Sequence, residues 1–151
     1  MTDFNMGWMK EAFFLAEMAA AEGEVPVGAI VVKDGNIISR GYNRRERLQN
    51  PIAHAEVIAI EGATKATGSW RLVDCVLVVT LEPCPMCLAA SQQARIGKIV
   101  YAATDKKGGA LSLGYRLNED VRTNHRFPVQ KVEMAECGQI LTDFFAKRRE
   151  E

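Results

Sequence analysis

The chain has 151 residues, 48% hydrophobic and 25% charged, which is the composition of one globular domain spanning 1–151 and excludes a disordered or fibrous protein. Nineteen basic residues balance nineteen acidic ones, so any contact with a polyanion must come from a local patch. No apolar run is long enough to cross a bilayer, and the N-terminus lacks a signal-peptide pattern. We therefore expect a cytoplasmic protein without membrane contact.

The first half of the chain predicts a helix, a β-hairpin and a second helix. Apolar residues recur at helical spacing over 7–22, and Gly23 follows where a C-terminal cap belongs. Two runs rich in β-branched residues, 27–32 and 37–42, flank a four-residue turn that contains Asp34 and Gly35. A basic loop over 43–52 and a helix over 53–66 follow.

The second half predicts alternating strands and helices. The continuous apolar run 75–80 is typical of a buried strand, and a helix over 85–95 leads to a strand over 98–102 in a parallel crossover. Residues 103–128 contain only a turn or two of helix, before a last strand over 129–134 and a closing helix over 136–149. This order predicts an α/β fold, a three-layer α/β/α sandwich around a mixed sheet of roughly five strands.

The cysteines indicate where chemistry occurs. Four cysteines are too few for a disulfide framework at this length, and Cys84 and Cys87 form a C-x-x-C pair that suggests metal or redox chemistry. Cys75 and Cys137 are expected to be buried apolar thiols.

Two predicted helix starts together offer a zinc site. His54 and Glu56 open one helix, and Cys84 and Cys87 open another after the buried strand. Two thiolates and one imidazole suit zinc, and three protein ligands leave the fourth tetrahedral position open, as in catalytic sites. Zinc lowers the pKa of bound water to roughly 7, which supplies a nucleophile at neutral pH.

Glu56 lies two residues beyond the predicted ligand His54, so on a helix it projects to a different side and is free to move protons. Attack of water on the amine-bearing carbon of a nucleobase needs a carboxylate that carries a proton to the ring nitrogen and to the departing ammonia. H-x-E alone is usually a surface or core pair, and C-x-x-C alone is evenly divided between metal binding and other uses. Together, about thirty residues apart, they match the signature of zinc nucleobase deaminases.

Over nearly its whole length the chain resembles the bacterial tRNA wobble-adenosine deaminases of the cytidine-deaminase-like superfamily. Beyond the zinc motifs, the resemblance rests on these stretches: Glu24–Ala29, Gly41–Arg44, Trp70–Leu72, Val79–Cys84, Arg95–Gly97, Asn124–Arg126 and Asp143–Phe145. It implies conversion of adenosine to inosine at the wobble position, with a tRNA anticodon loop as partner. It also implies a homodimer with one Zn²⁺ per subunit.

The resemblance assigns roles to individual positions. His54, Cys84 and Cys87 would hold zinc, and Glu56 would be the proton shuttle. Asn43 would hydrogen-bond the flipped base, in a pocket lined by Val27, Leu81 and Phe145. If the substrate is RNA, phosphate contacts are expected from cationic side chains near the mouth of the site, because a neutral chain has no other way to hold a polyanion: Lys106, Lys107, Arg148 and Arg149.

Two stretches depart from the family pattern and leave other substrates open. These are Leu88 to Gln93 and Leu111 to Gly114, and residues 83–88 resemble guanine deaminases of the same superfamily. The first alternative is therefore a deaminase of free nucleobases or nucleosides of the guanine, adenine or cytosine type. The second is a non-catalytic RNA-binding zinc protein in which His125 or another cysteine closes the metal shell, which Glu56 and the three-ligand set disfavour.

Overall fold

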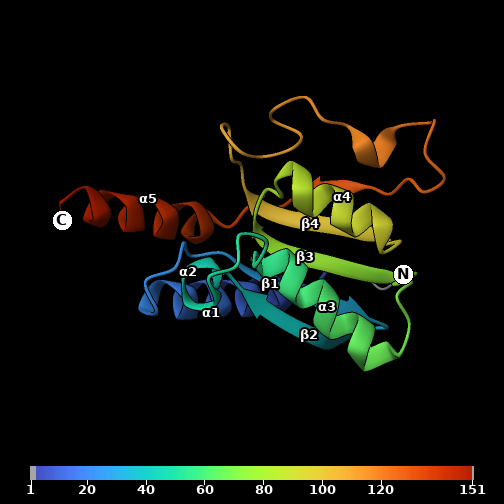
Figure 1. Ribbon diagram of the computed structural model, residues 1–151, viewed down its shortest axis with the longest axis horizontal. Coiled ribbons are helices and arrows are strands. Elements are labelled where there is room, and N and C mark those ends of the chain that lie inside the picture. The colour runs from blue at the N-terminus through green and yellow to red at the C-terminus, as the bar shows by residue number, and fades with distance from the viewer. Residues whose placement is uncertain (1–2, 151) are drawn as a thin grey trace.

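A five-stranded sheet forms the centre of the computed structural model, which describes residues 3–150 (Figure 1). Three strands are antiparallel neighbours, in the order β2 (Asn36–Tyr42), β1 (Gly28–Lys33) and β3 (Cys75–Leu81). Two more continue the sheet in parallel, β4 (Lys98–Ala103) and then β5 (Val129–Lys131). The predicted mixed sheet and its parallel crossover between β3 and β4 are confirmed.

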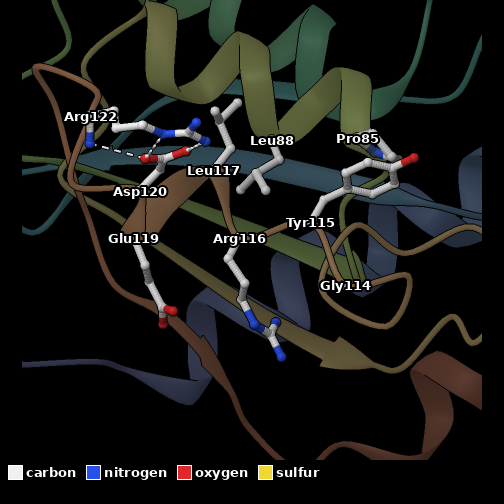
Figure 2. Close-up of a pocket in the computed structure, with 9 residues that line it drawn as sticks. All are labelled: Pro85, Leu88, Gly114, Tyr115, Arg116, Leu117, Glu119, Asp120 and Arg122. Atoms are coloured by element: carbon white, nitrogen blue, oxygen red, sulfur yellow. Dashed lines mark hydrogen bonds and ion pairs between the residues drawn. The ribbon is translucent and has the colours of Figure 1, made fainter.

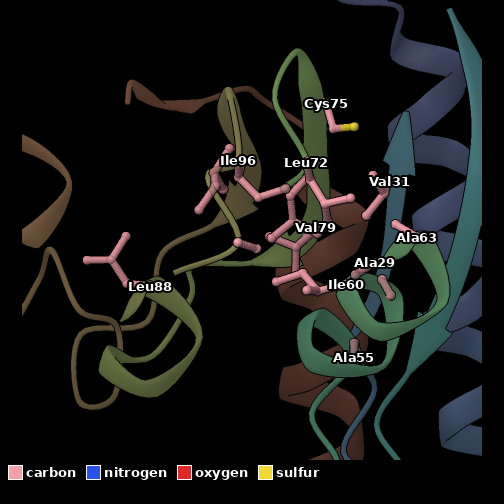
Figure 3. Packing of buried hydrophobic residues seen from close by; sticks show 14 of the residues in the cluster. Ala29, Val31, Ala55, Ile60, Ala63, Leu72, Cys75, Val79, Leu88 and Ile96 are labelled. Carbon is pink, nitrogen blue, oxygen red and sulfur yellow. The ribbon is translucent and has the colours of Figure 1, made fainter. Parts of the chain in front are cut away.

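Helices cover both faces of this sheet (Figure 1). The helices α1 (Met6–Ala21) and α5 (Ala135–Arg149) pack on one face, and α3 (Ala55–Thr67) and α4 (Pro85–Gln93) pack on the other. Alternate strand residues supply the two cores, because successive side chains of a strand point to opposite faces. Figure 3 shows the core under α3, where the helix presents alanines to β1. The three-layer α/β/α sandwich is confirmed.

Local sequence features explain where the elements begin and turn. The side chain of Asn5 accepts a hydrogen bond from the backbone N–H of Gly7 at 2.8 Å and caps α1. The hairpin between β1 and β2 turns at Asp34 and Gly35, both with positive φ, as a two-residue turn requires. At Gly28 a Cβ atom would lie 1.9 Å from the carbonyl oxygen of Ala12, so glycine lets α1 approach the sheet closely.

The structure explains three differences from the predicted boundaries. The basic loop 43–52 contains a short helix, α2 (Arg45–Leu48), because the Glu24 carboxylate accepts hydrogen bonds from two of its N–H groups. The helix expected from residue 53 begins at Ala55, with His54 in extended conformation before it. The last strand ends at Lys131, because the following apolar residues pack into the core beside α1 and α5. The other ends agree within two residues, and the predicted turn of helix is η1 (Leu117–Glu119).

The helix α5 projects past the edge of the sheet, and the C-terminus lies at its far end (Figure 1). Its first turn is anchored by the fully buried Cys137, whereas its last turn is basic and exposed. A basic last turn complements the negative end of the helix dipole. None of the helices described within residues 3–150 is long and apolar enough to cross a membrane.

Candidate active site

The starts of α3 and α4 bring the three predicted metal ligands together. His54 directly precedes α3, Cys84 directly precedes α4, and Cys87 lies in the first turn of α4. The Nδ1 atom of His54 is 3.6 Å from the Cys84 sulfur and 3.4 Å from the Cys87 sulfur. All three ligand atoms lie within 4.8 Å of one another. The starts of α3 and α4 therefore face each other.

Asn43 fixes the start of α3 from outside the helix. Its Oδ1 atom accepts a hydrogen bond at 2.8 Å from the backbone N–H of Ala55, which supplies the cap that His54 does not make. His54 therefore keeps an extended backbone, and its imidazole is free to face the cysteines. Asn43 itself is 8% exposed, and within residues 3–150 its Nδ2 donors have no hydrogen-bond partner.

The donor set has the chemistry of a metal site. The hydrogen bond from the Cys87 thiol and, after it, the hydrogen bond with His54 lower the pKa of Cys84 to about 4, although burial opposes them. The hydrogen bond between the two cysteines and burial raise the pKa of Cys87. The hydrogen bond to Cys84 also raises the pKa of His54. One sulfur thus carries negative charge beside a thiol and an imidazole, a set of soft donors that fits zinc.

Glu56 lies next to this group without belonging to it. Its carboxyl group is on the first turn of α3, and the residue is only 4% exposed. Burial raises the pKa of Glu56 to about 7, against the opposing effects of its own backbone N–H and of the charge on His54. A carboxyl group with this pKa both accepts and releases a proton near neutral pH.

A pocket of about 570 Å³ brings together four of the predicted substrate residues. Lys106 and Lys107 come from the loop after β4, Leu81 from the end of β3, and Phe145 from α5. Phe145 is 43% exposed, so an aromatic face is available at the rim. Apolar walls with cationic side chains beside them suit a base attached to phosphate.

A smaller pocket of about 110 Å³ holds Asn43 and Arg148 beside Arg45. Val25 lines both pockets, so they adjoin. Arg148 donates a hydrogen bond to the Gly23 carbonyl at 2.9 Å, which ties α5 to the start of this region. The two remaining predicted residues line neither pocket: Val27 is buried in the core, and Arg149 is exposed at the end of α5.

Two buried carboxylates near these pockets have no role that sequence reasoning identifies. Glu24 and Glu82 are each 2% exposed, and each accepts hydrogen bonds from a loop 20 to 30 residues away along the chain. Their signal in the sequence is an acidic residue inside an apolar stretch just before a proline, at Pro26 and Pro83. Nothing in that signal identifies the distant loops.

The stretch Leu88 to Gln93 faces the segment that follows η1. Leu88 is buried and, with Arg116, lines a pocket of about 490 Å³ that holds none of the predicted site residues (Figure 2). Gln92 donates a hydrogen bond to the His125 carbonyl at 3.3 Å.

The alternative candidates for a fourth metal ligand lie elsewhere. The His125 ring makes a 2.7 Å hydrogen bond with the Ile96 carbonyl, and Cys75 and Cys137 are buried. Within the described residues these three side chains do not join the ligand group. The group therefore offers three protein ligand atoms, the number that an open zinc site has.

Comparisons with known proteins agree on a deaminase. Residues 4–149 match the model of the MafB19-like deaminase family. The chain is 46% identical over 143 residues to a tRNA-specific adenosine deaminase of Bacillus subtilis (strain 168), covering 94% of this chain and 89% of that protein.

Two solved structures are similar throughout. One, from work on A-to-I editing by tRNA:A34 deaminases at the wobble position of transfer RNA, is 40% identical with a TM-score of 0.86, covering 91% of this chain and all of that one. The other, a guanine deaminase from Bacillus subtilis, is 34% identical with a TM-score of 0.65, covering 97% of this chain and 95% of that one.

Proposed function

This chain belongs to the tRNA-specific adenosine deaminases within the MafB19-like deaminase family, and on that basis we propose that it hydrolyses adenosine to inosine at the wobble position of a tRNA. The reaction consumes one water and releases ammonia. The observation that carries the proposal is the group of His54, Cys84 and Cys87 with the buried Glu56 beside it. We propose that the sequence 1–151 is one catalytic domain built around these residues.

His54, Cys84 and Cys87 would hold one Zn²⁺ per chain, since two sulfurs and an imidazole nitrogen converge within one coordination sphere. With Zn²⁺ bound there, these residues would present an activated water at neutral pH. The three residues orient that centre from two helix starts that the sheet holds rigidly. Rigid elements keep catalytic groups in productive geometry better than mobile loops do.

Glu56 moves the protons. It takes a proton from the attacking water and delivers it to the ring nitrogen of the base, then takes the proton of the newly formed hydroxyl and delivers it to the departing amine, which leaves as ammonia. Its raised pKa supports this role, because the carboxyl group stands near half-protonation at neutral pH. It is not one of the three residues of the ligand group, so its carboxyl group is not committed to the metal.

The base is proposed to bind between the residues that the resemblance assigns. Leu81 and Phe145 would flank it from the larger pocket, Val27 would support the wall from the core, and Asn43 would donate from its free Nδ2. A flipped base is read by hydrogen bonds and by stacking between apolar side chains. The Oδ1 atom of Asn43 already accepts the hydrogen bond that caps α3, which holds the side chain with its Nδ2 donors unused.

The anticodon loop would be held by cationic side chains around the pockets, namely Lys106, Lys107, Arg148 and Arg149. We also propose a homodimer in the cytoplasm, which follows from the family and its tRNA substrate.

The decisive experiment measures ammonia release from an anticodon stem-loop with a wobble adenosine, and from free adenosine, guanine and cytosine. The expected result is turnover of the stem-loop, with inosine detected by mass spectrometry, and none by Glu56→Ala. Turnover of free guanine without turnover of the stem-loop would replace the proposal with the small-molecule alternative. Measuring zinc content and ammonia release before and after chelation tests whether the activity depends on the metal.

A further inference from the structure

Two buried carboxylates each accept hydrogen bonds from a basic loop, and the loop is a different one for each carboxylate. Glu24 and Glu82 are both 2% exposed, and neither belongs to the predicted metal or proton-transfer group. A buried carboxylate is costly unless donors satisfy it. If the loop moved away, the carboxylate would stay buried without its hydrogen-bond donors. The free-energy cost of that loss therefore holds the loop in one position.

Glu82 holds the loop that follows β4. It accepts hydrogen bonds from the Asp105 N–H at 3.1 Å, the Ser112 N–H at 2.8 Å and the Ser112 hydroxyl at 2.7 Å. The middle of the loop also packs on this carboxylate, because a Cβ atom at Gly109 would lie 2.2 Å from the Glu82 Cδ. The Ala110 N–H donates to the carbonyl of Pro83, next to the metal ligand. The loop is thus attached at the start of α4.

Glu24 holds α2 in the same way. Its two oxygens accept separate hydrogen bonds, from the Glu46 N–H at 3.1 Å and the Arg47 N–H at 2.8 Å. These donors belong to the loop that begins at Asn43 and carries Arg45 into the smaller pocket.

The two held loops flank one region. Lys106 and Lys107 line the larger pocket, Arg45 lines the smaller one, and Val25 belongs to both. Asp105, which lines the larger pocket too, accepts hydrogen bonds from the backbone N–H groups of Lys107 and Gly108, so it shapes the loop.

We propose that Glu24 and Glu82 are positioning residues that set the affinity for the RNA substrate without touching it. The inference rests on the proposed function. It adds how the protein positions the basic side chains that would contact the RNA. Ordering a free loop during binding costs conformational entropy, and the two carboxylates remove that cost beforehand. Basic side chains at fixed spacing then meet the phosphates on both sides of the flipped base.

A double-mutant cycle tests the Glu82 half through the dissociation constant of a stem-loop that carries inosine at the target position and is therefore not consumed. Glu82→Gln and the pair Lys106→Ala with Lys107→Ala should each weaken binding about tenfold, the size of a lost charged hydrogen bond. Combined, they should weaken it little more than either alone, because Glu82 acts through the lysines. Additive effects would overturn the proposal.

Two smaller changes keep the test meaningful if Glu82→Gln fails to fold. Ser112→Ala removes one of the three donors and should raise the dissociation constant, while Ser112→Thr keeps a hydroxyl and should restore it. Equal affinity for the two variants would contradict the proposed role. Glu24→Gln with Arg45→Ala repeats the cycle for α2.

The matched control is Asn118→Ala, which removes another 2% exposed polar side chain whose hydrogen bond to the Phe127 carbonyl involves neither basic loop. It should lower stability and leave RNA affinity within about twofold. If the wild-type protein fails to bind or deaminate the stem-loop, the proposed function fails. If it does both and the cycles are additive, only the positioning role fails.

Discussion

Glu56 and Glu82 are equally buried glutamates with opposite surroundings. Glu82 is 2% exposed and accepts three hydrogen bonds from one loop. Glu56 is 4% exposed, and burial raises its pKa to about 7 although its own backbone N–H, the charge on His54 and the Cys87 thiol oppose the shift. Burial alone therefore does not decide what a carboxylate does. Glu82 uses its oxygens to hold a loop, whereas Glu56 holds no loop and lies beside the predicted metal ligands.

Removing a metal ligand should produce the largest effect and leave the loop held by Glu82 in place. Cys87→Ser should lower zinc from about one per chain to nearly none and abolish deamination, because a serine hydroxyl is a poor substitute for a thiolate. Metal analysis and ammonia release measure this. Hydrogen exchange in residues 105–112 serves as the control and should stay protected; full zinc occupancy in the variant would contradict the ligand assignment.

Changing Glu56 tests the other member of the pair directly. Glu56→Gln should reduce kcat by about 10²- to 10⁴-fold, since the amide cannot carry a proton, while zinc content stays unchanged. Single-turnover kinetics with the stem-loop, alongside metal analysis, separate the two effects. A variant that keeps most of its activity, or one that loses its metal, would require a different role for Glu56.

Crowding the Glu82 anchor should cost stability. Gly109→Ala places a methyl group against the carboxylate, whose three hydrogen bonds keep it from moving aside, and should lower the free energy of unfolding by about 1–3 kcal/mol. Urea denaturation measures the change. Gly114→Ala is a useful comparison, because that glycine has open space around it but a positive φ, so only backbone strain applies. Unchanged stability in Gly109→Ala would show that the loop packs less closely on Glu82.

Charge reversal at the rim should have the smallest effect on the chemistry. Lys106→Glu with Arg149→Glu should weaken stem-loop binding and reduce the slope of log affinity against log salt by about 0.7 to 0.9 for each phosphate that the variant no longer neutralises. A salt titration at constant pH measures the slope, and kcat at saturating RNA should hardly change. A slope equal to that of the wild type would remove these side chains from the RNA surface.

The fold was largely predictable because its elements are locally encoded. The apolar run of β3, the turn at Asp34 and Gly35, and the cap at Gly68 each act within a few residues. The errors occur where a residue distant in the sequence determines whether a helix forms or where it begins. Glu24 creates α2 from 22 residues away, and Asn43 moves the start of α3, neither of which periodicity can reveal.

The candidate site likewise has a part that the sequence predicts and a part that it does not. The spacing of His54, Cys84 and Cys87 predicts the ligand group, because helix starts after strands meet at one sheet edge. The grouping of Lys106 with Phe145 depends on how α5 crosses the loop after β4, and single-sequence patterns do not encode that crossing. The anchoring by Glu82 was hidden for the same reason.

The order of the site residues along the chain has a consequence for synthesis on the ribosome. His54, Glu56 and both ligand cysteines are all made before β4, whereas residues 105–112 and α5 come afterwards. A domain generally folds as a unit, and parallel pairing must wait for its second strand. The proposed metal ligands are therefore made before the loop and helix that carry the proposed RNA contacts, but the sheet that positions both is completed only when β5 has been made.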